Sequence, residues 1–141
     1  MQWVYDQSRI DWIQLSELYR IAPLGDKKPD DLELAFSNSL YKCFVYEGGE
    51  LVGAGRALAD GVDCSYLCDV AVHPNLQGRG LGKAIIVKLK ELSANHKKII
   101  LYAKPGTEGF YKKLGFARMR TTMAIFRDRE SAIGNRLIGD D

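Results

Sequence analysis

The sequence predicts an α/β fold, and three of its features support that prediction. Residues 70–83, VAVHPNLQGRGLGK, join an apolar strand to a helix through a turn that contains three glycines and two cations. Apolar residues then recur at helical spacing from Leu81 to Leu92, with lysines between them. Upstream, two alternating apolar segments flank Gly48 and Gly49, a pattern typical of a β-hairpin. Alternating strands and helices of this kind pack as layers around one core.

The remaining elements follow from periodicity and from turn residues. The expected strands are 3–5, 41–46, 51–58, 64–72, 98–103 and 119–126, and the expected helices are 11–20, one that begins at Pro29, 81–92 and 106–114. Pro29 suits a first helical turn, and the two aspartates after it complement the positive end of the helix dipole. Gly115 ends the last helix. We expect one domain over residues 1–141, with a charged, frayed tail at 127–141.

Length and composition fit one globular domain. A chain of 141 residues can bury about two thirds of its unfolded surface, so it needs no disulfide or metal to fold. The net charge is only +2, and basic residues are interleaved with acidic ones, which argues against a nucleic-acid partner. No stretch approaches the roughly 18 apolar residues of a membrane span, and the first residues lack the pattern of a signal peptide. We therefore expect a cytoplasmic protein that binds neither nucleic acid nor membrane.

The cysteines and histidines do not form a metal-binding pattern. Cys64 and Cys68 stand four residues apart in an expected strand, about 13 Å from each other, which is too far for a disulfide. Cys43 is expected in the core. His73 begins the glycine-rich turn, and His96 lies near a helix end. None of these spacings is that of a zinc site, so we expect no metal.

The glycine-rich turn is suited to holding an anion. Gly78, Gly80 and Gly82 let backbone N–H groups approach a phosphate, and the N-terminus of the following helix adds its dipole. Arg79 and Lys83 add positive charge. The turn therefore predicts a ligand that carries a pyrophosphate, and the alternative is a plain glycine-rich connection.

Spacing excludes two common nucleotide sites. A Walker A loop needs a glycine and a Ser or Thr at positions that hold Gln77 and Ala84 here. The Rossmann fingerprint G-x-G-x-x-G is also absent, because the order is Gly78-x-Gly80-x-Gly82.

The pattern Gln77-x-x-Gly80-x-Gly82 after an apolar strand resembles the pyrophosphate arm of the GNAT acetyltransferase superfamily. Residues 109–116, GFYKKLGF, resemble the FYxKLGF element of that superfamily, and residues 51–56 resemble its third strand. The resemblance covers about residues 41–126. It implies a mixed, mostly antiparallel central sheet of six to seven strands, splayed between the fourth and fifth, with helices on both faces. Where many members carry Asn and, three residues later, Ala, this chain has Lys104 and Thr107.

The resemblance also implies which residues bind acetyl-CoA as co-substrate. Backbone groups of the fourth strand take the pantetheine arm, the turn takes the pyrophosphate, and a lysine of the FYxKLGF element reaches the nucleotide end. The implied binding residues are Val70, Ala71, Val72, Gln77, Gly78, Arg79, Gly80, Leu81, Gly82, Lys83 and Lys113.

Two residues are candidates for acid and base catalysis. Tyr111 matches the tyrosine of FYxKLGF, and a phenol of pKa about 10 can protonate a departing thiolate whose conjugate acid has a pKa of roughly 8.5. The alternative for Tyr111 is packing of its helix. Asp69 is the nearest carboxylate in the motif and is a candidate base, directly or through water; alternatively it pairs with Arg56 across the preceding hairpin. Tyr66 and Glu108 are further candidates for the base.

Together these features predict an acetyl-CoA-dependent N-acetyltransferase that acts by direct attack of a primary amine in a ternary complex. A small-molecule amine is favoured as acceptor; the alternatives are a protein amine or a CoA-binding regulatory module without turnover. Candidate pocket residues are Trp12, Tyr19, Phe36 and Met123, for which the alternative is a place in the core; if they line the site, they favour an amine with an apolar or aromatic body. A homodimer is left open.

Overall fold

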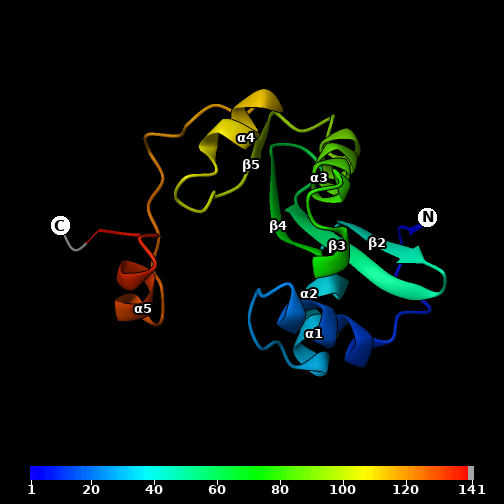
Figure 1. The fold of residues 1–141 in the computed structure, drawn as a ribbon. Helices are drawn as coiled ribbons and strands as arrows, with labels where there is room; N and C mark the ends of the chain where they lie inside the picture. The colour runs from blue at the N-terminus through cyan, green and yellow to red at the C-terminus, as the bar shows by residue number, and fades with distance from the viewer. Residues whose placement is uncertain (140–141) are drawn as a thin grey trace. The chain divides into compact units, whose positions relative to one another are not determined.

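The computed structural model describes residues 1–139, which divide into two compact units at Leu101 and Tyr102. The first unit holds β1 (Gln2–Val4), α1 (Trp12–Ile21), α2 (Pro29–Ser37), β2 (Tyr41–Glu47), β3 (Glu50–Ala59), β4 (Cys64–Val72), the short 3₁₀ helix η1 (Pro74–Leu76), α3 (Leu81–Leu92) and β5 (Lys98–Ile100) (Figure 1). The second unit holds α4 (Glu108–Lys113) and α5 (Arg129–Gly134).

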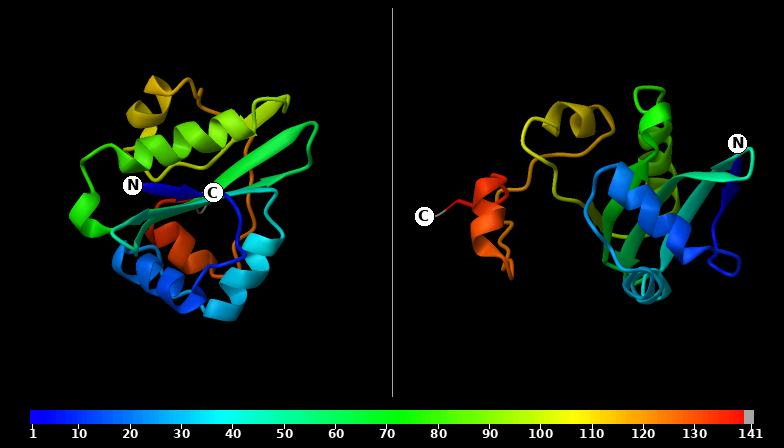
Figure 2. Two further views of the ribbon diagram at one scale, coloured as in Figure 1. Left: turned by 90° about the vertical axis from the view of Figure 1, so that its right-hand side faces the viewer. Right: turned by 60° about the horizontal axis from the view of Figure 1, so that its bottom comes forward.

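One mixed sheet in the order β1-β2-β3-β4-β5 forms the centre of the first unit. Neighbouring strands are antiparallel except β4 and β5, which are parallel. Figure 2 shows α3 on one face of the sheet and α1 with α2 on the other. Glycines of β3 allow α3 to lie close: a Cβ at Gly55 would stand 2.8 Å from Cγ2 of Ile85. The expected α/β class and mostly antiparallel sheet are confirmed.

The core between the sheet and the first two helices is aromatic and aliphatic. Asp11 caps α1 by accepting hydrogen bonds from the N–H groups of Ile13 and Gln14, and this fixes where the helix begins. The core cluster consists of Leu15, Leu18, Tyr19, Leu32, Phe36, Phe44, Leu51, Ala54 and Ala71. Tyr19 and Phe36 are 0% exposed, so the expectation that they wall an acceptor pocket is wrong.

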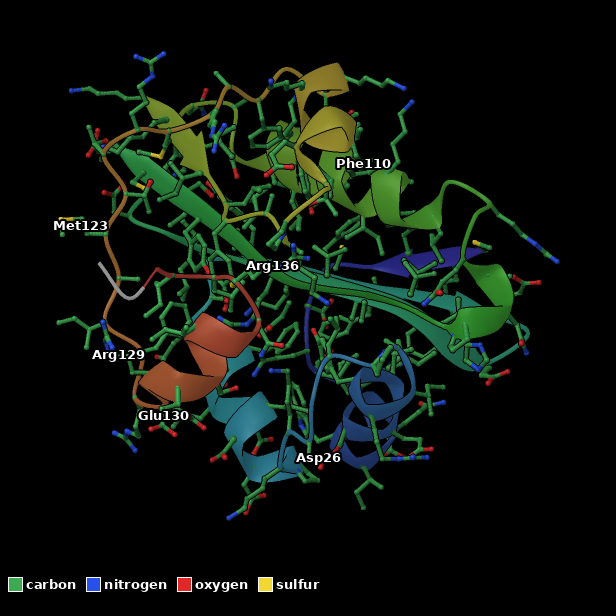
Figure 3. All side chains as sticks on the ribbon, turned by 60° about the vertical axis from the view of Figure 1, so that its left-hand side comes forward. Asp26, Phe110, Met123, Arg129, Glu130 and Arg136 are labelled. Atoms are coloured by element: carbon green, nitrogen blue, oxygen red, sulfur yellow. The ribbon has the colours of Figure 1, made fainter. Side chains whose placement is uncertain are left out.

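The expected count of six to seven strands is also wrong, because the described residues form five. Residues 119–126 were expected to close the sheet, but they pair with no strand in the described part of the chain. Their apolar side chains are open to solvent: Met123 is 94% exposed and points away from the ribbon (Figure 3). The alternating pattern was present, yet a strand also requires a partner ladder. Beyond this segment Asp128 caps α5, a short helix within the charged tail.

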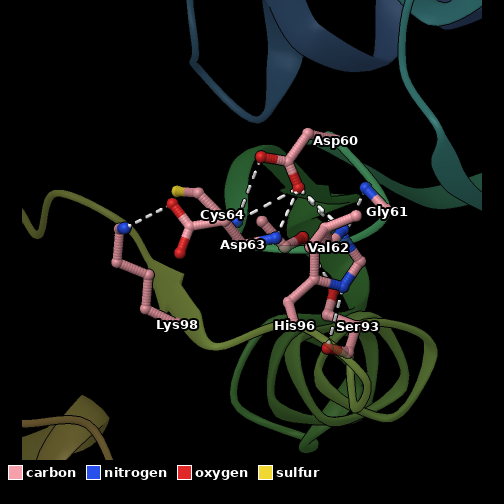
Figure 4. A network of polar contacts seen from close by, with 9 residues as sticks. Asp60, Gly61, Val62, Asp63, Cys64, Ser93, His96 and Lys98 are labelled. Carbon is pink, nitrogen blue, oxygen red and sulfur yellow. Dashed lines mark hydrogen bonds and ion pairs between the residues drawn. The ribbon is translucent and has the colours of Figure 1, made fainter.

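A polar network joins the β3–β4 turn to the C-terminal end of α3 (Figure 4). Nε2 of His96 accepts a hydrogen bond from the Gly61 N–H at 2.9 Å, and Nδ1 lies 3.1 Å from the Ser93 carbonyl oxygen. A carbonyl only accepts, so Nδ1 is assigned as the donor in this contact and Nε2 as the acceptor from Gly61. The Ser65 and Ser93 hydroxyls lie 2.8 Å apart, and both residues are fully buried. His96 thus connects the β3–β4 turn to the residue that ends α3.

We expect His96→Ala to lower the free energy of unfolding by about 1–3 kcal/mol, because the Gly61 N–H loses its acceptor and the buried ring leaves a cavity. Urea unfolding followed by circular dichroism measures this. Lys98→Ala is the control: its ion pair with Asp63 is half exposed, so the midpoint should barely move. Equal effects of the two variants would contradict a structural role for the network.

Candidate active site

The turn between β4 and α3 presents backbone donors on an open surface. Gly78 and Gly80 have φ of +80° and +85°, and nothing lies within 4 Å of where a Cβ would stand at either. Gly80 is the N-cap of α3, and the first intrahelical bond runs from the Ala84 N–H to the Gly80 carbonyl. The three N–H groups before Ala84 therefore have no helical acceptor, and they can bind an anion that approaches along the helix axis.

Hydrogen bonds and one buried side chain hold the turn in place. The Gln77 side-chain amide donates to the Val72 carbonyl at 3.2 Å, and the His73 N–H donates to the Val52 carbonyl at 2.8 Å. Leu81 is buried beneath the turn, whereas Arg79 and Lys83 are exposed. Gln77, predicted as a binding residue, thus uses its side chain to hold the turn. The two cations extend into solvent, where they can meet a phosphate.

A β-bulge interrupts β4 just before the turn. Ala54 of β3 pairs with Ala71 and Arg56 pairs with Cys68, so β4 carries one extra residue in this interval. Within the bulge Asp69 has φ of +55°, a conformation that is costly for a residue with a side chain. The bulge changes the direction in which β4 presents its backbone groups.

The strand also continues past its parallel neighbour. β5 pairs with β4 only at Cys64–Tyr66, so Val70 and Val72 lie beyond the end of that ladder. Their side chains face α3: Val70 Cγ2 lies 3.4 Å from a Cβ built on Gly55, and Val72 Cγ2 lies 3.6 Å from one built on Gly82. β5 therefore does not pair with the part of β4 that precedes the glycine-rich turn.

The side chain of Asp69 lies on the other face of the sheet from α3, the face that α1 and α2 cover. Its Oδ2 accepts a hydrogen bond from Arg56 Nε at 2.8 Å, and its Oδ1 lies 3.6 Å from Lys27 Nζ. Its carbonyl accepts a hydrogen bond from the Tyr19 hydroxyl at 2.6 Å. The predicted pairing of Asp69 with Arg56 is therefore present. The contacts from Tyr19 and Lys27 are additions that sequence reasoning missed, and no local pattern signals them.

Cys68, next to this cluster, is poorly suited to act as a nucleophile. Burial raises the pKa of its thiol to about 11, so the thiolate needed for attack is scarce at neutral pH. Tyr66, a further candidate base, lies opposite Leu58 of β3 and Ile100 of β5 in the paired part of the sheet.

The second unit carries Tyr111 in the middle of α4. Its ring is half-buried and makes edge contacts with Phe110 and Phe116, with ring centroids 5.0 Å and 5.9 Å away. Burial raises the pKa of the Tyr111 phenol above its ordinary value, so the hydroxyl keeps its proton at neutral pH. No hydrogen bond to that hydroxyl is present among the described residues.

The neighbours of Tyr111 complete the motif. Lys112 and Lys113 are exposed in the last turn of α4. Before the helix, the Thr107 hydroxyl donates to the Lys104 carbonyl at 2.6 Å, which forms a turn at the positions that differ from many family members. The Glu108 carboxylate accepts a hydrogen bond from the Gly106 N–H, so this candidate base stabilises its own loop.

Two kinds of feature are absent from the described residues. No group of three or more His, Cys, Asp and Glu within residues 1–139 is placed to hold a metal ion. Within the same residues, no helix is long and apolar enough to cross a membrane.

Comparison with known families decides the relationship. The model of the GNAT acetyltransferase family matches residues 9–116, which include the bulge, the glycine-rich turn and Tyr111. The chain belongs to this family. Its motifs at residues 77–82 and 109–116 are therefore those of a GNAT protein, as the sequence predicted, and the family generally uses acetyl-CoA as co-substrate.

Curated relatives agree with this assignment. An uncharacterized ycf52-like N-acetyltransferase of Prochlorococcus marinus is 31% identical over 80% of this chain and 67% of its own length. Serotonin N-acetyltransferase 2, chloroplastic, of Oryza sativa is 40% identical over 58% of this chain and 44% of its own length. Histone acetyltransferase TAP1 of Glycine max is 39% identical over 59% of this chain and 38% of its own length. The chain thus spans less than half the length of the last two relatives.

Solved structures show the same fold. A protein of unknown function from meticillin-resistant Staphylococcus aureus superposes with a TM-score of 0.77 at 22% identity, over 89% of this chain and 96% of that one. A GNAT family acetyltransferase of Streptococcus pneumoniae superposes with a TM-score of 0.73 at 22% identity, over 90% of this chain and 100% of that one. The overall fold is thus shared at low sequence identity.

The expected cytoplasmic location is contradicted. The rice relative is named chloroplastic, and so is GCN5-related N-acetyltransferase 1 of Arabidopsis thaliana, which is 42% identical over 46% of this chain. The expectation came from the absence of a signal-peptide pattern and of a long apolar segment, and neither absence carries information about an organelle.

Proposed function

We propose that this chain is an acetyl-CoA-dependent N-acetyltransferase that acts on a primary amine by direct attack in a ternary complex, and that residues 1–141 act together as one domain. The observation that carries the proposal is the continuity of the bulge, the glycine-rich turn and the N-terminus of α3 within residues 69–83. Along that segment, backbone groups of β4 come first and the free N–H groups of α3 follow. This order suits a ligand that has a thioester at one end, beside the strand, and a pyrophosphate farther along, beside the helix.

The residues present fit acetyl-CoA. Positive φ at Gly78 and Gly80 and the open space around both glycines leave the turn accessible to a diphosphate, with Arg79 and Lys83 as counter-charges. When bound, acetyl-CoA supplies the thioester carbonyl that the amine attacks. The backbone of Val70, Ala71 and Val72 orients the pantetheine arm, and an N–H of this segment stabilises the oxyanion that develops on the carbonyl.

Tyr111 is proposed as the general acid. Its match to the family motif supports this role, and so does the raised pKa of its phenol, which keeps the hydroxyl protonated. The phenol gives its proton to the thiolate as the carbon–sulfur bond breaks. Lys113 is proposed to contact the nucleotide end of the ligand.

A small-molecule amine is proposed as the acceptor. The relative named serotonin N-acetyltransferase supports an amine with an aromatic body, whereas the relative named histone acetyltransferase supports a protein amine as the second candidate. A CoA-binding module without turnover would need the turn but not Tyr111.

An amine panel with detection of released CoA thiol tests the acceptor. We expect serotonin or tryptamine to give a kcat/KM at least about tenfold above that of glucosamine 6-phosphate or a histone tail peptide, as the relative named serotonin N-acetyltransferase suggests. Faster turnover of the peptide would favour the protein acetyltransferase. Acetyl-CoA binding by calorimetry without turnover of any amine would favour the regulatory module.

A further inference from the structure

We propose that Asp69 is a positioning residue rather than the general base, and that Tyr19, Arg56 and Lys27 act through it to hold the β4 bulge in the shape that presents the Val70 N–H to the thioester. This inference rests on the proposed function. It assigns a role to a cluster that joins α1, β3 and the α1–α2 loop to one residue of β4.

The bulge requires external support because its backbone is strained. Asp69 holds φ of +55°, and outside glycine this conformation persists only where surrounding contacts over-determine it. Asp and Asn tolerate it better than other residues that carry a side chain. The conformation turns the Asp69 carbonyl toward α1.

Tyr19 supplies the contact from α1. Its hydroxyl donates to the Asp69 carbonyl at 2.6 Å, and the whole residue is 0% exposed within the core cluster. Burial, reinforced by the nearby Asp69 charge, raises the Tyr19 pKa well above its ordinary value, so the hydroxyl remains a donor. Since Tyr19 is fixed by close packing on all sides, its hydroxyl defines where the Asp69 carbonyl can lie.

Two cations hold the carboxylate. Arg56 donates to Oδ2 at 2.8 Å, and Lys27 Nζ lies 3.6 Å from Oδ1. Arg56 is itself held, because it also donates to the Ser39 hydroxyl at 3.2 Å. Removing a proton from an amine would disrupt these ion pairs, which disfavours Asp69 as a base. Lys27 belongs to the α1–α2 loop, so the same carboxylate attaches that loop to the bulge.

Three substitutions at Asp69 separate a positioning role from a base. Asp69→Asn keeps an oxygen that can accept from Arg56 and keeps tolerance of positive φ, but it has no basic carboxylate. In Asp69→Gly, the glycine adopts positive φ freely but has no side chain to pair with the cations. In Asp69→Val, the β-branched valine disfavours positive φ. We expect kcat of the Asn variant to stay within about threefold of wild type, and kcat of the Val variant to fall about 100-fold.

The pH profile gives a second readout. The positioning role predicts that the Asn variant keeps the shape of the wild-type profile of kcat/KM, and that Gly retains more activity than Val. A fall of about 100-fold in kcat for both Asn and Gly, with loss of one limb of the profile, is the result expected of a general base and would overturn the proposal.

Tyr19→Phe tests the contact from α1, and Tyr46→Phe is its control. Tyr46 packs against the same core cluster without bonding to Asp69. We expect Tyr19→Phe to lower kcat about tenfold with little change in the KM for acetyl-CoA, and to shift the Val70 amide signal in NMR spectra. The control should change neither, and identical kinetics of the two variants would refute the role of Tyr19.

The outcome remains interpretable if the proposed function fails. Absence of CoA release by the wild type with every amine would refute the acetyltransferase. In that case a Val70 amide shift in Tyr19→Phe, absent from Tyr46→Phe, would still support the positioning role, and an unshifted amide would refute it.

Discussion

Gly80→Asp is expected to abolish acetyl-CoA binding while the chain remains folded. Gly80 has φ of +85° and is the N-cap of α3, directly before the N–H groups that have no helical acceptor. An aspartate there places a side chain in the space through which a diphosphate must approach, together with a charge of the same sign as the ligand. We expect the Kd for acetyl-CoA to rise at least about 100-fold, a loss of about 2.8 kcal/mol of binding free energy, measured by calorimetry.

Two further variants separate the causes. Gly61→Asp is the matched control, because Gly61 has the same φ of +85° and the same open space, but it lies in the β3–β4 turn before β4 begins. It should bind acetyl-CoA as the wild type does. Gly80→Asn keeps the size of aspartate without its charge, so it should fall between wild type and Gly80→Asp. Unchanged affinity in a folded Gly80→Asp variant would remove the turn from the site.

Much of the first unit could be predicted from the sequence because its signals are local. Gly48 and Gly49 specify a hairpin, and the spacing from Leu81 to Leu92 specifies the buried face of α3. The same local reasoning gave 119–126 as a strand, and it was wrong about this segment. Whether an alternating sequence joins a sheet depends on a partner ladder, which no property of the segment itself reports.

The candidate site also has one part that the sequence predicts and one that it does not. The turn was predictable because glycine spacing and charge act within a few residues of each other. The support of Asp69 was not, because Tyr19 is 50 residues away and Lys27 is 42 residues away in the sequence. Tyr19 was expected to wall a pocket, yet the packing that buries it comes from helices and strands spread over the first unit. Apolar or aromatic character alone does not distinguish a pocket wall from a core residue.

Tyr111→Phe is the second large effect that we expect. Phenylalanine keeps the ring and its edge contacts with Phe110 and Phe116, but it removes the proton that the thiolate needs. We expect kcat to fall about 100-fold or more, with acetyl-CoA affinity nearly unchanged. Stopped-flow detection of CoA thiol and calorimetry measure the two quantities. Tyr41→Phe is the control, since Tyr41 lies on β2 with its ring against His96 and should keep wild-type kcat.

The pH dependence adds an independent test of Tyr111. Burial raises the pKa of its phenol above the ordinary value of about 10, so the proton is retained below that pH and lost only above it. The loss of activity that this group causes should therefore begin above pH of about 10 in the wild type and be absent from the variant. The free energy of unfolding should also fall as the pH rises through this range, because burial in the folded state disfavours the phenolate. The wild type should therefore lose stability relative to Tyr111→Phe only in that alkaline range. A variant with wild-type kcat from neutral pH to the alkaline limit would mean that solvent or another group protonates the thiolate, and Tyr111 would then have only a packing role.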